Sequence, residues 1–200
     1  MEHMANHVRI RGTLAAMPRF SHENHGKRFF RLHLQVPRLS GAVDILPVVV
    51  EEGILNSADL GSGEYFTVTG QVRSHNIRSD GRRHLLIFVF ANTLVCEDGE
   101  PLNEVTVSGT ICREPTYRRT PLGREICDVM LAVPRAFKRA DYLPCILWGK
   151  TAQEVSRCHT RDSLSITGRL QSRIYTKLTE AGSEERTAYE ISALSAQVVE

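Results

Sequence analysis

Four aromatic residues in the second half of the chain are interleaved with positively charged residues. The aromatic residues are Phe137, Tyr142, Trp148 and Tyr175. The cations around them are Arg135, Lys138, Arg139, Lys150, Arg169, Arg173 and Lys177. Flat rings stack on nucleobases and cations contact phosphates, so this pattern is typical of a groove for a single nucleic-acid strand.

Two of these rings occupy one face of a predicted strand over residues 142–148. Tyr142 and Trp148 fall on even positions, whereas Leu143, Cys145 and Leu147 fall on odd positions. Because side chains alternate between the two faces of a strand, the rings point away from the apolar set and are available for stacking. The alternative is structural: Trp148 would pack beneath a loop, and Tyr142 would cover one end of the fold.

The elements that carry these residues occur twice. Shifting the chain by 97 positions superimposes residues 6–50 on 103–147. The recurring residues are Asn6 with Asn103, Val8 with Val105, Gly12-Thr13 with Gly109-Thr110, Pro18 with Pro115, Gly26 with Gly123, Leu34 with Leu131, Val36-Pro37-Arg38 with Val133-Pro134-Arg135, Asp44 with Asp141, and Leu46-Pro47 with Leu143-Pro144. One added residue aligns Gly70 and Ser74 with Gly168 and Ser172. The repeat indicates two copies of one domain.

Period-two alternation predicts that each copy is mostly β. The predicted strands are 7–14, 30–36, 45–50, 66–73 and 84–95, with counterparts at 104–111, 127–133, 142–148, 163–171 and 187–198. A short helix at 151–157 fits between the third and fourth strands, and glycines inside the strands allow the sharp bends of a small closed barrel. The predicted fold class is therefore all-β, with two tandem five-stranded OB-fold barrels.

The predicted domains are 1–97 and 103–200, joined by a short linker at 98–102. Residues 97–101, Glu-Asp-Gly-Glu-Pro, are acidic and turn-forming, which favours a tight connection.

The second copy resembles the bacterial single-stranded DNA-binding protein family along most of its length. The matching segments are Asn103-Glu-Val-Thr-Val-Ser-Gly-Thr-Ile, Arg113-Glu114-Pro115, Gly123, Val129-Met-Leu-Ala-Val, Leu147-Trp148-Gly149-Lys150, Ala152-Gln-Glu154, Ile166-Thr-Gly168-Arg169-Leu170-Gln-Ser-Arg173-Ile-Tyr175, Thr187 and Glu190. The resemblance implies that Phe137, Tyr142, Trp148 and Tyr175 stack on the bases of single-stranded DNA. It further implies a homodimer of two-domain chains that presents four OB folds.

The first copy departs from this pattern at the stacking positions. Ser40 aligns with Phe137, Ile45 with Tyr142, Glu51 with Trp148 and Ile77 with Tyr175. Glu51 and Glu52 also place negative charge where a phosphate backbone would pass. We therefore expect residues 6–96 to bind weakly, or to act in dimerisation and as a scaffold.

The chain ends at Val198-Val199-Glu200, directly after the last predicted strand. Members that recruit other enzymes usually end in a flexible acidic tail, so we expect no tail-mediated recruitment. This favours an accessory, mobile-element, competence or restart role over general replication.

Other chemistries lack a signature in the sequence. The five cysteines form no CxxC pair and are expected to be small buried hydrophobes, and His22 and His25 are expected in a polar loop. No nucleophile elbow, Walker loop or HExxH motif is present, so we expect no enzyme, metal or cofactor. Without an 18-residue apolar run or a signal peptide, we expect a cytoplasmic protein without a membrane segment.

The leading hypothesis is non-catalytic, sequence-tolerant binding of single-stranded DNA in replication, recombination or repair. Two alternatives stay open. The barrels could mediate protein interactions in a primosome-like or mobile-element adaptor, or the groove could bind single-stranded RNA, because OB grooves accept either backbone.

Overall fold

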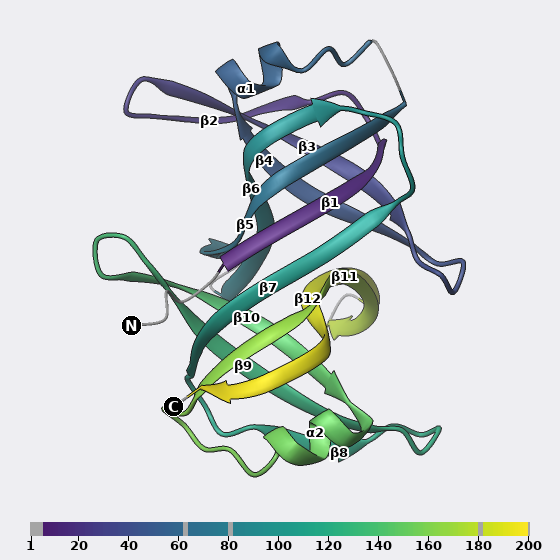
Figure 1. Cartoon of the computed structure of the whole chain (residues 1–200), viewed down its shortest axis with the longest axis vertical. Helices are drawn as coiled ribbons and strands as arrows, with labels where there is room; N and C mark the ends of the chain where they lie inside the picture. The colour runs from purple at the N-terminus through teal and green to yellow at the C-terminus, as the bar shows by residue number, and fades with distance from the viewer. Residues whose placement is uncertain (1–5, 62–63, 80–81, 180–181, 200) are drawn as a thin grey trace.

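The computed structural model describes residues 6–61, 64–79, 82–179 and 182–199, whose strands form two small barrels stacked along the long axis (Figure 1). The N-terminal barrel contains β1 (Asn6–Leu14), β2 (Arg19–Asn24), β3 (Lys27–Pro37), β4 (Val43–Glu51), β5 (Tyr65–Ser79) and β6 (Arg82–Cys96). The C-terminal barrel contains β7 (Leu102–Ile111), β8 (Thr116–Arg119), β9 (Glu125–Arg135), β10 (Arg139–Trp148), β11 (Ser163–Thr179) and β12 (Gly182–Val199).

Five strands close each barrel. In the N-terminal barrel the pairs β1·β5, β5·β6, β6·β4, β4·β3 and β3·β1 form a ring, and only β4·β6 is parallel. The strands β7, β11, β12, β10 and β9 close the second ring in the same order. Their alternating inward side chains, such as Leu34, Val48 and Leu131, are fully buried and fill the core.

A short helix follows the third barrel strand in both copies, α1 (Glu52–Ser57) and α2 (Gly149–Val155). The predicted fold of two five-stranded OB barrels, each with one helix, is therefore confirmed. Some details differ from the prediction: α2 lies two residues earlier than 151–157, and short outer strands β2 and β8 precede the second barrel strand of each copy. The fourth and fifth barrel strands also extend into longer hairpins than predicted, with β5 ending at Ser79 and β11 at Thr179. No helix in the described part of the chain is long and apolar enough to cross a membrane.

The two barrels join through β1 and β7, which lie side by side at the centre of the molecule (Figure 1). Val8 pairs with Val105 in this antiparallel contact, and these two residues are equivalent in the repeat. An approximate two-fold axis therefore passes between them. The repeated asparagines serve the same purpose in each barrel: the Asn6 side chain bonds both backbone groups of Val72, and the Asn103 side chain bonds both of Leu170.

A second pair of contacts crosses between the barrels around two fully buried carboxylates, Asp44 and Asp141. Asp44 accepts bonds from Arg38 of its own barrel and from both the backbone N–H and the hydroxyl of Ser172 in the other. In the contact related by the two-fold axis, Asp141 accepts the backbone N–H of Ser74 at 2.8 Å and lies 3.4 Å from Arg135. The repeated aspartates thus link the two barrels, because each accepts a hydrogen bond from a serine of the other barrel.

We expect this docking to weaken in acid. Burial alone would raise the pKa of Asp44, but the bonds from Arg38 and Ser172 together outweigh it and hold the pKa below its ordinary value of 3.8. A lowered folded-state pKa contributes stability that is present above the unfolded value and is lost as the pH falls through the folded value. In urea unfolding, Asp44→Asn should cost about 3–5 kcal/mol at pH 7, because it leaves the Arg38 charge without its buried partner. That difference should shrink below about pH 4; an equal difference at pH 7 and pH 3.5 would contradict this account.

Two expectations on individual side chains are corrected. Cys127, Cys145 and Cys158 are buried as predicted, and burial raises the pKa of the Cys127 thiol to about 11. Cys96 is only half-buried and Cys112 is exposed, so the prediction is wrong for these two. His22 lies in β2 rather than in a loop, and its ring stacks on Phe29 with centroids 4.9 Å apart.

Candidate functional site

The four predicted stacking rings all project from the C-terminal barrel to solvent. The exposed fraction is 43% for Tyr142, 36% for Trp148, 38% for Tyr175 and 93% for Phe137. Leu143, Cys145 and Leu147, between the two rings of β10, are at most 3% exposed. Tyr142 and Trp148 thus lie opposite the buried odd positions of β10, as the alternation predicts, although Ile146 on the even face is also buried. Stacking by these rings stays a prediction.

Trp148 is the last residue of β10, and its indole is held in place. Its Nε1–H donates a hydrogen bond to the Ser192 hydroxyl of β12 at 3.1 Å. Ser192 is in turn the cross-strand partner of Arg169 on β11. The ring, the hydroxyl and the guanidinium therefore lie on neighbouring strands, and the ring keeps an open side with its orientation fixed.

Tyr175 lies further along the β11–β12 hairpin beside a charged pair. The Arg173 guanidinium lies 5.6 Å from the centroid of the Tyr175 ring and 3.5 Å from the Glu190 carboxylate. Glu190 also accepts a bond from Gln171 at 3.0 Å. Sequence reasoning missed Gln171 and Ser192 as parts of this surface, because neither has a charge or a ring.

Tyr142 and Phe137 lie at the other end of β10. Six residues separate Tyr142 from Trp148, which is roughly 20 Å along a strand. Phe137 and Lys138 form the turn between β9 and β10, with positive φ of 60° and 54°. The rings are therefore well separated along the barrel and do not form the walls of one pocket.

The predicted phosphate-contacting cations differ in solvent exposure and in whether a carboxylate already pairs with them. Lys138 and Arg139 are exposed, Lys150 is exposed and lies 3.7 Å from Glu154, and Arg169 is half-buried. Arg135 is committed in part to Asp141 at the barrel contact. The side chain of Lys177 lies outside the described residues.

The N-terminal barrel lacks rings at the matching positions, as the alignment predicts, but aromatic residues gather elsewhere on it. Glu51, which stands in place of Trp148, is neutralised by Lys27 at 2.9 Å. On the neighbouring strand β6, Phe90 occupies the place of Ser192, lies 5.9 Å from Phe29 and has the guanidinium of Arg73 5.6 Å from its centroid. The sequence alignment does not show that Phe90 matches Ser192, because the shift between the two copies changes at the hairpin after β5. It is 98 residues at Gly70 and Gly168, but 102 residues at their strand partners Ala91 and Ala193.

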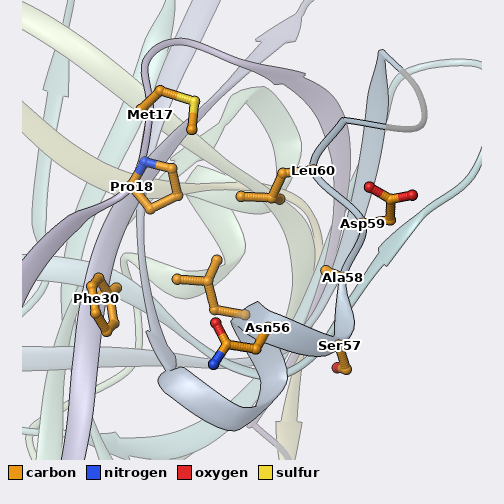
Figure 2. A pocket seen from close by; sticks show the side chains of 9 residues that line it. Met17, Pro18, Phe30, Asn56, Ser57, Ala58, Asp59 and Leu60 are labelled. Carbon is orange, nitrogen blue, oxygen red and sulfur yellow. The ribbon is translucent and has the colours of Figure 1, made fainter.

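A cavity of about 510 Å³ opens at the end of the N-terminal barrel, between β3 and α1 (Figure 2). Met17, Pro18, Phe30 and Leu60 surround it. It contains none of the predicted site residues. Within the described ranges, no three His, Cys, Asp or Glu side chains are arranged to hold a metal ion.

A family profile and several curated relatives match this chain. A profile of the single-strand binding protein family matches residues 102–199. Single-stranded DNA-binding protein B of Bacillus subtilis is 36% identical over 80 residues, which cover 36% of this chain and 71% of that protein. Single-stranded DNA-binding protein 3 of Listeria innocua is 33% identical over 108 residues, or 50% of this chain and 64% of that protein.

The two-barrel fold also has a solved counterpart. The single-stranded DNA binding protein from Thermus aquaticus superimposes with a TM-score of 0.78 over 98% of this chain and 94% of that chain, at 23% identity. That identity supports the fold alone. The profile match and the Bacillus subtilis relative show that this chain belongs to the single-strand binding protein family.

Proposed function

We propose that the chain binds single-stranded DNA, without catalysis and with little dependence on base sequence, in DNA replication, recombination or repair. The observation that carries the proposal is the row of solvent-facing rings at Tyr142, Trp148 and Tyr175, with Arg169 and Arg173 beside them. Rings accept any base because every base has a flat face, and the cations attract the phosphates. The names of the relatives support the same ligand.

Competition between nucleic acids tests this proposal. A labelled oligo-dT strand bound to the chain is displaced with unlabelled oligo-dT, with RNA of matched sequence, and with a duplex of equal length. We expect oligo-dT to compete best. Better competition by RNA would assign the groove to RNA, and the absence of any complex would favour a protein-interaction adaptor.

The phosphate contacts should be visible in the salt dependence. Arg173 is exposed and next to the Tyr175 ring, so Arg173→Ala should lower the slope of log K against log salt by about 0.7, the value for one phosphate contact on a single strand. Arg157→Ala removes an exposed arginine that follows α2, outside the strands that carry the rings, and should leave the slope unchanged. Equal effects of the two variants would contradict the placement of the phosphate path.

We also propose that two chains form a homodimer with four barrels. One chain already joins two barrels through β1 and β7, with Val8 opposite Val105. Light scattering should give a particle of twice the 22.5 kDa chain mass. A particle of one chain mass would overturn the dimer without affecting strand binding.

A further inference from the structure

One strand edge of the ring surface is completed by the other barrel. β10 pairs with β9 along its whole length but with β12 only at Cys145 and Ile146. Toward Tyr142, therefore, this edge of β10 has no partner strand in its own barrel. Ser74, from β5 of the N-terminal barrel, fills the gap: the backbone N–H of Tyr142 donates a hydrogen bond to the Ser74 hydroxyl at 2.7 Å.

The equivalent contact in the repeat, between Ser172 and Asp44, has a different hydrogen-bond pattern. Ser172 is the repeat equivalent of Ser74, and its backbone N–H bonds Asp44 at 2.7 Å just as that of Ser74 bonds Asp141 at 2.8 Å. The hydroxyls differ: that of Ser172 donates to the Asp44 carboxylate, whereas that of Ser74 accepts from the backbone of Tyr142. The repeat symmetry is thus broken at the Ser74 hydroxyl, whose hydrogen-bond partner Tyr142 carries a ring.

The carboxylates are also held unequally. Asp44 accepts both Arg38 bonds as well as those of Ser172. Asp141 Oδ2 is buried without a hydrogen-bond partner among the described residues, and Arg73 and Arg135 approach the carboxylate only to 3.7 and 3.4 Å. Because the arginines hold Asp141 less closely than Arg38 holds Asp44, this end of β10 depends more on the two hydrogen bonds of Ser74, one to Asp141 and one to the backbone of Tyr142.

We propose that Ser74 is a positioning residue for the Tyr142 ring, so that the N-terminal barrel completes the stacking surface of the C-terminal barrel. The inference rests on the proposed function. It assigns the N-terminal barrel a part in binding that needs no ring of its own, because a fixed backbone at Tyr142 keeps its ring in place before a base arrives.

Four variants test the assignment with oligo-dT at moderate salt. Ser74→Ala should weaken binding about three- to tenfold, since a hydrogen bond and part of one stacking contact are lost. Ser74→Thr keeps a hydroxyl and should restore affinity to within about twofold. Ser172→Ala removes the hydroxyl at the equivalent position of the repeat and should stay within about twofold of wild type. In a Tyr142→Ala background, Ser74→Ala should have no further effect, because the ring it positions is gone.

A second readout needs no nucleic acid. Amide hydrogen exchange at Tyr142 should speed up in Ser74→Ala, while exchange at Leu143 and Leu131 stays as in wild type. Undiminished affinity in Ser74→Ala, or equal losses from Ser74→Ala with and without the Tyr142 ring, would overturn the inference. If the wild type fails to bind oligo-dT, the proposed function fails first, and the inference with it. If Trp148→Ala weakens binding but Ser74→Ala does not, only the inference fails.

Discussion

Replacing Trp148 with Ala should weaken binding to oligo-dT by roughly 5- to 150-fold, the equivalent of about 1–3 kcal/mol for one base–aromatic contact. The loss should be similar at every salt concentration, because stacking releases no counterions. Trp148 is expected to give the largest effect of the rings, because its indole is both exposed and held in one orientation by Ser192.

The matched control is Tyr117→Ala. Tyr117 on β8 belongs to the same barrel, and its side chain is 40% exposed. Tyr117 pairs with Cys127 of β9, whereas Trp148 pairs with Ile126. Because neighbouring residues of a strand point to opposite faces, the two rings lie on opposite faces of the sheet. The Tyr117 variant should bind within about twofold of wild type. Wild-type affinity in the Trp148 variant would show that the stacking surface is wrongly assigned.

Gly168→Ala should destabilise the chain by about 3 kcal/mol or more, which corresponds to a fall in Tm of about 10 °C for a chain of this size. An added Cβ at Gly168 would lie 2.2 Å from the backbone oxygen of Ser192, which no side-chain rotation relieves. The strand register shifts at this glycine, so the close approach is part of how the barrel closes.

The same substitution at Gly53 should not lower the free energy of unfolding. Gly53 lies in α1, and an added Cβ would come no closer than 4.0 Å to Glu51 Oε1. Gly53→Ala should therefore be neutral or stabilise by up to about 1 kcal/mol, through lower unfolded-state entropy. Thermal unfolding of both variants checks the pair; equal Tm values for the two would contradict the assigned role of Gly168.

Much of the fold could be predicted because its determinants are periodic or repeated. Alternation placed Tyr142 and Trp148 opposite the core face of β10, and the shift of 97 residues revealed two copies. The glycine positions predicted bends, and the register shifts at Gly70 and Gly168 lie where the strands curve. Such signals lie within a few residues of one another or recur at a fixed distance.

What escaped prediction depends on contacts between distant residues. β2 is exposed along most of its length, so it carries no alternation to read. Phe90 lies on β6, at the position equivalent to Ser192 in the second copy, and this equivalence follows only from the pairing register of β6. Arg135 was predicted as a phosphate contact, but its partner Asp141 and the docking residue Ser74 meet only once the barrels are assembled.

The most direct measurement uses Trp148, the only tryptophan of the chain, as its own probe. The protein is titrated with oligo-dT and then with a duplex of equal length, at low and moderate salt, while tryptophan fluorescence is followed. The stacking account predicts strong quenching by the single strand that persists at moderate salt, with little quenching by the duplex. An unchanged signal together with no complex in a label-free assay, or equal quenching by the duplex, would contradict it.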